Sequence, residues 1–66
     1  MKNTIKVERA KRNITQDELA KAVEVSRQTI NAIETGKFIP STLLALKLSR
    51  YFNTSVNEIF ELENHD

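Results

Sequence analysis

Residues 15–36 read TQDELAKAVEVSRQTINAIETG, and this stretch decides the fold. Thr15 followed three residues later by Glu18 is a capping box, in which each side chain bonds a free N–H at the start of a helix. Ser26 is a second helix cap, and Gly36 ends the segment that Ser26 begins. The pattern predicts one helix over 16–23 and another over 27–35, separated by a turn of only three residues.

The apolar residues of these two helices fall at the intervals that a steep crossing needs. A turn this short forces the second helix across the first, so one residue at the closest approach must be small and its neighbours must fill the wedge. Six positions meet this requirement, with Ala20 as the small one: Leu19, Ala20, Val23, Val25, Ile30 and Ile33. Residues 16–35 are therefore predicted to form a helix-turn-helix.

The opposite face of the second helix carries side chains that suit base recognition. Arg can pair with the O6 and N7 acceptors of guanine, Gln and Asn with N6 and N7 of adenine, and Thr can offer its methyl group to thymine. A nine-residue helix is about 13 Å long, which places three or four side chains over one half-site in a major groove. The expected outward residues are Arg27, Gln28, Thr29, Asn31 and Ala32.

Downstream, Ser41 caps a predicted helix over 42–52. Its apolar positions cover a wide face, which predicts a central and well-buried helix: Leu43, Leu44, Leu46, Leu48 and Phe52. The run from Ser55 to Glu58 repeats the capping-box pattern and predicts a short fifth helix that turns Val56, Ile59 and Phe60 inward.

Upstream, the first helix has two candidate buried sides. One consists of Ile5, Arg9 and Arg12, and the other of Val7, Ala10 and Ile14; the sequence alone leaves both open. Asn13 tolerates the left-handed conformation of a C-terminal cap. Lys2 to Thr4 is expected to be extended and residues 60–63 alternate as a strand does, which allows a two-stranded ribbon that joins the termini.

Composition narrows the class of protein. A chain of 66 residues forms one domain, here spanning 1–66, and it has no cysteine and a single His, so no metal site or cofactor is expected. No apolar run approaches the length of a membrane span and no signal peptide is present, which predicts a soluble, cytoplasmic protein. No clustered nucleophiles or carboxylates indicate an enzyme, and no small-molecule ligand is evident.

Positive and negative residues are distributed unevenly along the chain. Residues 1–37 carry eight Lys or Arg against five acids, whereas residues 38–66 carry two against four. This polarity suits a domain that offers one end to a polyanion.

Together these stretches resemble the Xre or phage-repressor/Cro type of helix-turn-helix regulators, especially their short free-standing members. The matching segments are Thr15–Ala20, Val25–Lys37, Pro40-Ser41 and Leu44–Leu48, and the resemblance covers nearly the whole chain. It implies an all-α, five-helix bundle of the lambda-repressor type that binds double-stranded DNA sequence-specifically.

The resemblance also implies residue roles. It assigns major-groove base contacts to Arg27, Gln28, Thr29 and Asn31, and phosphate contacts to Gln16, Arg9, Gly36 and Lys37. It pairs Arg9 with Glu34, which ties the first helix to the reading helix. Two positions depart from the family pattern. Glu24 stands where Gly is frequent, which costs free energy if φ is positive there, and Glu8 stands where many members have Leu.

A module this small, making few phosphate contacts, is expected to act as a homodimer. Two reading helices about 34 Å apart would read a palindromic operator. The family resemblance implies that the protein acts as a repressor. The dimerisation region is expected at about 53–66, with Val56, Phe60 and Leu62 at the interface. The alternative is an antitoxin-like protein-binding module; such proteins usually add a toxin-gripping segment beyond the bundle, and here six residues follow Phe60.

Overall fold

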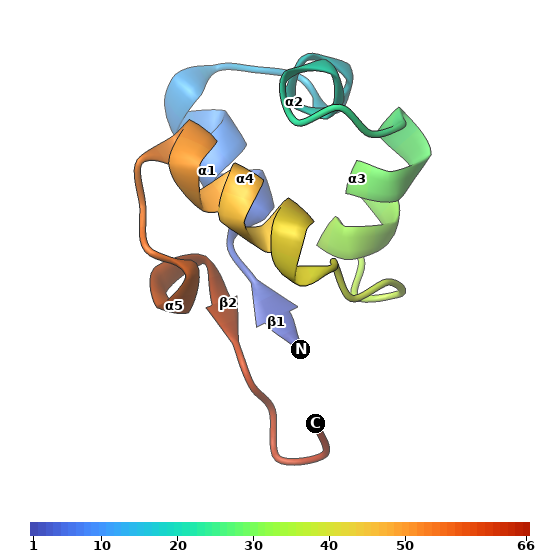
Figure 1. Cartoon of the computed structure of the whole chain (residues 1–66), viewed down its shortest axis with the longest axis vertical. Coiled ribbons are helices and arrows are strands. Elements are labelled where there is room, and N and C mark those ends of the chain that lie inside the picture. The colour runs from blue at the N-terminus through green and yellow to red at the C-terminus, as the bar shows by residue number, and fades with distance from the viewer.

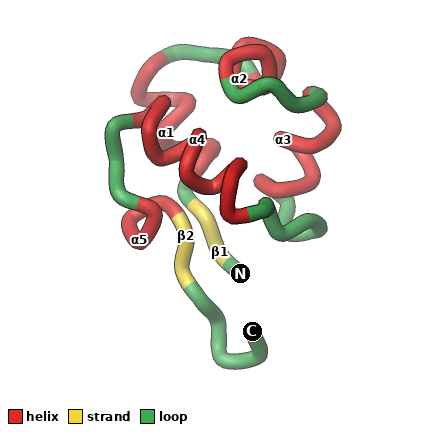
Figure 2. The backbone as a smooth tube through the Cα atoms, in the orientation of Figure 1, coloured by secondary structure: helices red, strands yellow, loops and turns green.

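The computed structural model describes all 66 residues (Figure 1). One short strand precedes five helices, and a second short strand follows them. The tube in Figure 2 shows the two strands lying side by side below the helices, next to α5. None of the helices has the length and apolar character that a membrane crossing requires. In chain order the elements are β1 (Lys2–Asn3), α1 (Ile5–Arg12), α2 (Gln16–Ala22), α3 (Arg27–Glu34), α4 (Thr42–Phe52), α5 (Val56–Ile59) and β2 (Phe60–Glu61).

Hydroxyl side chains start three of the helices, as predicted. Thr15 and Glu18 form the reciprocal capping box at α2, and the hydroxyl groups of Ser26 and Ser41 accept N–H bonds from the first turns of α3 and α4. The predicted capping box at α5 is wrong. The Ser55 hydroxyl instead contacts Oε1 of Glu58 at 2.9 Å, so it leaves the backbone N–H groups of that single-turn helix uncapped.

The core forms where α2 and α3 cross and where α4 closes against them. It consists of eleven buried apolar residues: Ile5, Leu19, Ala20, Val23, Ile30, Ile33, Leu44, Leu48, Phe52, Ile59 and Phe60. Five of the six positions predicted for the wedge belong to it, and Val25 packs against it while partly exposed. The spacing argument for the helix-turn-helix core is confirmed.

The first helix buries the side that begins at Ile5. Ile5 is fully buried and the Arg9 side chain is only 15% exposed, whereas Val7 is 53% exposed. Arg12 reaches across to α4, where its guanidinium lies 4.9 Å from the centre of the Phe52 ring and donates to the Phe52 carbonyl oxygen. Of the two sides that the sequence allowed, the one with Ile5, Arg9 and Arg12 therefore faces inward.

The buried face of α4 is narrower than the sequence predicted. Leu44, Leu48 and Phe52 are in the core, but Leu43 and Leu46 are 64% and 55% exposed. Successive helical residues are turned by about 100°, so Leu46 lies about 200° from both Leu44 and Leu48. Because the other helices cover only one side of α4, these two leucines remain in solvent.

The chain ends are joined by the ribbon that the sequence allowed. β1 and β2 are antiparallel, with Lys2 opposite Glu61 and Asn3 opposite Phe60. The strand at residues 60–61 is shorter than the alternation over 60–63, and Phe60 belongs to it while remaining buried. The ammonium group of Met1 pairs with Glu63 and Asp66 at 3.0 and 3.1 Å, which closes the ribbon.

Candidate nucleic-acid interface

A tight turn sets the crossing of α2 and α3. Glu24 adopts a left-handed conformation with φ of 64°, and the next residue, Val25, donates its N–H to the Ala20 carbonyl oxygen at 2.9 Å. The family's frequent Gly at this position would adopt that φ freely, whereas a side chain there costs about 1–2 kcal/mol. The Glu24 carboxylate makes an exposed ion pair with Lys47 of α4 at 3.0 Å.

One face of α3 is buried in the core and the other is exposed to solvent. Ile30 and Ile33 are buried, and Gln28 lies about opposite them on the helix, exposed. Arg27 and Asn31 are exposed on the flank that faces the start of α2, and neither Arg27 nor Gln28 forms a hydrogen bond or ion pair within the chain. The side chains assigned to base contacts are thus available to a ligand on one side of the helix.

Thr29 lies apart from the other three. It is partly buried and lines a hollow between α3 and α4 together with Val23 and Leu44. The Thr29 hydroxyl lies 2.8 Å from the Ser26 hydroxyl, with which it forms a hydrogen bond. The methyl group is therefore the part of the Thr29 side chain that stays without a polar contact.

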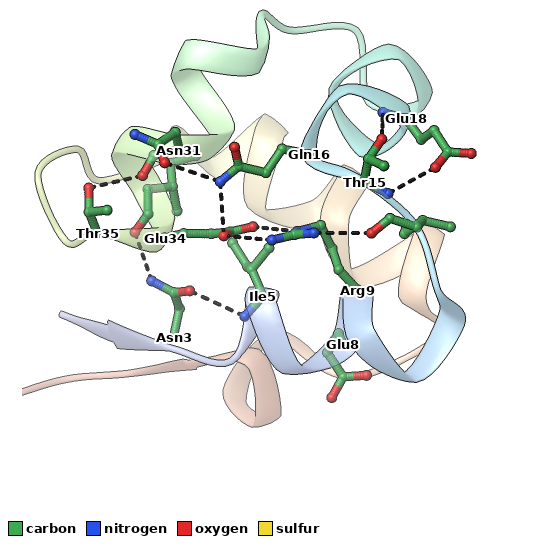
Figure 3. A network of polar contacts seen from close by, with 12 residues as sticks. Asn3, Ile5, Glu8, Arg9, Thr15, Gln16, Glu18, Asn31, Glu34 and Thr35 are labelled. Atoms are coloured by element: carbon green, nitrogen blue, oxygen red, sulfur yellow. Dashed lines mark hydrogen bonds and ion pairs between the residues drawn. The ribbon is translucent and has the colours of Figure 1, made fainter.

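A network of polar side chains fixes α3 to the rest of the domain (Figure 3). Nε and Nη2 of Arg9 contact the two carboxylate oxygens of Glu34 at 2.6 and 3.0 Å, and Nη1 donates to the Ile14 carbonyl oxygen. The Glu34 side chain is only 6% exposed. The hydrogen bonds that Arg9 donates to Glu34 raise the pKa of Arg9 above its ordinary value, so its guanidinium stays charged.

Gln16, at the first position of α2, extends this network toward the exposed side of α3. Its Nε2 donates to Oδ1 of Asn31 and to Oε1 of Glu34, each at 3.1 Å. A side-chain amide has only two N–H groups, so both donors of Gln16 are in use. The Nδ2 group of Asn31 keeps its own two donors and points away from the network in Figure 3.

Two contacts of this region could not be found in the sequence pattern. Asn3 on β1 donates to the Ile33 carbonyl oxygen at 2.8 Å and accepts from the Ile5 N–H, so it holds the C-terminal end of α3 against α1. Thr35, one turn beyond Asn31 and exposed, bonds back to the Asn31 carbonyl oxygen. A lone Asn or Thr carries no periodic signal that would single it out.

The loop after α3 begins with Gly36 in the left-handed conformation, with φ of 77°. The following N–H of Lys37 donates to the Ala32 carbonyl oxygen at 2.8 Å, which holds this exposed Lys at the end of α3. Gly36 and Lys37 therefore lie at one end of the reading helix and Gln16 beside its middle.

The three residues expected at a dimer interface differ in exposure. Phe60 is 8% exposed and belongs to the core, Val56 is partly buried, and Leu62 is 77% exposed beyond the end of β2. Leu62 alone offers a large free apolar surface.

Comparison with known proteins agrees with this geometry. Residues 5–59 match the family described as helix-turn-helix. An uncharacterized HTH-type transcriptional regulator of Methanocaldococcus jannaschii is 48% identical over the whole of both chains, and the regulator YgzD of Bacillus subtilis is 42% identical over the whole of both. The ImmF control region 10 kDa protein of Bacillus phage phi105 is 34% identical over 80% of this chain and 59% of that protein.

The matched region contains α1 to α5, including the turn at Glu24 and the whole exposed face of α3. The proteins that match are regulators rather than enzymes. The chain therefore belongs to the Xre/Cro-type helix-turn-helix family of DNA-binding transcriptional regulators.

Proposed function

We propose that this protein binds a palindromic operator in double-stranded DNA as a homodimer and represses transcription in the cytoplasm, with α3 of each copy in the major groove. The observation that carries the proposal is the division of α3. Its inner face is fixed by Ile30 and Ile33, while Arg27 and Gln28 on the outer side make no contact within the chain. Long polar side chains free of structural duties on a rigid helix are what base reading requires.

Each outward residue has a distinct role. Arg27 and Gln28 contact base edges near the N-terminal end of α3, the Arg suited to guanine and the Gln to adenine. The Thr29 methyl group contacts a thymine at the edge of the groove. Lys37 and the Gly36 backbone contact phosphates at the other end of the helix, which sets the position of α3 along the groove.

The bond between Gln16 and Asn31 acts as a latch. Because both Gln16 donors are in use, Gln16 reaches a phosphate by exchanging its 3.1 Å bond to Asn31 for one to a phosphate oxygen. That exchange frees Oδ1 of Asn31, which then presents an acceptor and a donor together, as bidentate contact with adenine needs. Arg9 stays on Glu34 and offers its remaining N–H groups to the same phosphate.

Two copies are needed because one module makes few contacts. Two reading helices about 34 Å apart contact successive major grooves on one side of the duplex, and the second contact follows the first at high effective concentration. Repression requires only that a promoter be occupied. Similarity to a phage control-region protein supports such a regulatory role.

The proposal is tested by selecting bound sequences from a random pool of duplex DNA. We expect an enriched palindrome with half-site centres about one helical turn apart. Arg27→Ala and Gln28→Ala should keep the far-UV circular dichroism spectrum and lose preference at particular base pairs, each by about 1–3 kcal/mol. Lys2→Ala, which removes an exposed charge on the terminal ribbon, is the matched control and should keep the preference. Enrichment of no sequence, or an unchanged preference in both α3 variants, refutes the proposal.

A further inference from the structure

An uncovered apolar surface lies on α4 and on the loop that precedes it. Ile39 and Leu46 leave 63% and 55% of their surface in solvent. They border a hollow of about 250 Å³ whose other apolar walls are Pro40, Ala45, Val56 and Phe60. In Figure 1 this region lies where the start of α4 meets the terminal strands.

The apolar surface continues along α4. A second hollow, also of about 250 Å³, is lined by Leu43, Leu46, Lys47 and Arg50. Leu46 lines both hollows and therefore lies between them. We call the surface formed by Ile39, Leu43, Leu46 and Val56 the α4 face.

We propose that the α4 face is the docking site for a second copy of this chain, related to the first by a twofold axis that passes near Leu46. The inference rests on the proposed function, which requires two copies on one operator. Of the three residues expected at the interface from the sequence, only Val56 belongs to the α4 face. Phe60 is buried in the core of its own chain, and Leu62 does not line either hollow.

The chemistry of the face requires an apolar partner. Charged residues make up 29% of the chain, yet no charged side chain lines the first hollow. A polyanion or an acidic peptide would find no cationic side chain in that hollow, and Lys47 of the second hollow is paired with Glu24, whereas a second α4 face offers the same apolar side chains. The exposed side chains of Ile39 and Leu46 lie at the border of a hollow. A twofold rotation therefore brings these side chains of each copy to the hollow of the other copy.

The charges at the two ends of the face are complementary under the same rotation. Arg50 lies at one end and has no ion-pair partner within its own chain. At the other end, Met1 lines the first hollow, and its ammonium group is outnumbered by the carboxylates of Glu63 and Asp66 with which it pairs. A twofold axis near Leu46 points each Arg50 toward the acidic end of its partner, which favours this pairing over a parallel one.

A stable dimer buries about 800 Å² on each partner, roughly one sixth of the 4592 Å² that this chain exposes. The α4 face draws on three elements, the α3–α4 loop, α4 and α5. Only 12 of the 66 residues are buried in the single chain, so a small core gains much from covering these side chains.

The test is the oligomeric state of the full chain without DNA, measured by sedimentation equilibrium from micromolar to near-millimolar concentration. We expect the wild type to be dimeric, and Leu46→Asp to raise the dimer Kd by roughly 100-fold or more because both copies lose the central contact. Leu62→Asp is the matched control, since it places the same charge on an exposed leucine outside the face, and it should leave the Kd unchanged. Ile39→Asp is the second variant if Leu46→Asp does not fold.

The outcomes separate this inference from the proposed function. A wild type that stays monomeric, a dimer unaffected by the charge at Leu46 and at Ile39, or a dimer that only Leu62→Asp disrupts overturns the α4 interface. A chain that dimerises through Leu46 but enriches no sequence from random duplex DNA overturns the proposed function and leaves the interface standing. A wild type that stays monomeric without DNA but still enriches a palindrome overturns the interface and leaves the proposed function standing.

Discussion

The buried carboxylate of Glu8 should make this domain sensitive to acid. Its side chain is only 9% exposed, and Oε1 accepts from Nη1 of Arg12 at 2.9 Å while Oε2 accepts from Lys11 at 3.4 Å. The hydrogen bond from Arg12, and secondarily that from Lys11, hold the pKa of Glu8 below its ordinary value of 4.5, although burial opposes the shift. Because this pKa is lowered on folding, the ionised carboxylate stabilises the native state.

The perturbation is Glu8→Gln, which keeps the shape and removes the charge. One charge-assisted bond is worth about 1.5–3 kcal/mol, and Arg12, one third exposed, can be partly solvated, so we expect a loss of about 1–2 kcal/mol at pH 7. In a domain of this size that lowers the Tm by about 5–10 °C. The contribution is complete above pH 4.5 and disappears as the pH falls through the lower folded pKa, where the protonated carboxyl resembles the amide.

The assay is thermal unfolding followed by circular dichroism at one fixed protein concentration, because the proposed dimerisation would add to the apparent stability. Wild type and Glu8→Gln are compared at pH 7 and near pH 3, and we expect the gap in stability to be smaller at the lower pH. Glu61→Gln, an exposed glutamate without an ion pair, is the control and should change the stability by less than about 0.5 kcal/mol at either pH. A gap of equal size at both pH values would falsify the linkage argument.

Three further predictions follow from the turn and the reading face. Glu24→Gly should raise the free energy of unfolding in urea by about 0.5–1 kcal/mol, since relief of the left-handed conformation exceeds the added chain entropy; a variant no more stable than wild type contradicts the strain. Lys37→Ala should reduce the slope of log K against log salt by about 1 without changing base preference, and an unchanged slope removes Lys37 from the phosphate contacts. Gln16→Ala and Asn31→Ala should be coupled by about 0.5 kcal/mol or more in a double-mutant cycle on DNA affinity, whereas additive effects would argue against the latch.

The features that could be predicted from the sequence are those set by neighbours along the chain. The caps Thr15, Ser26 and Ser41 each bond an N–H three residues away, so the residue type and its spacing suffice to place the helix starts. The wedge between α2 and α3 is equally local, because only three residues separate the helices. The positive φ at Glu24 could be anticipated only as a consequence of the family pattern.

The features that escaped prediction depend on segments far apart in the chain. The exposure of Leu46 follows from which side of α4 the other helices cover, and an apolar pattern does not distinguish a core contact from an interface. The bond between Gln16 and Asn31 joins two side chains that were each assigned a DNA contact on its own, and their mutual contact was not predicted. Asn3 reaches the end of α3 from thirty residues away, which no local pattern reports.

The separation of the two faces of α3 has a consequence for how such regulators diversify. The side chains of Arg27 and Gln28 form no hydrogen bond or ion pair within the domain, so under the proposed function substitutions there would change the preferred operator at little cost in folding. After gene duplication, two copies would then acquire different targets through a few codon changes while sharing one scaffold. Asn31 would be the exception, because its bond to Gln16 means that a new target at that position would require a matching change in α2.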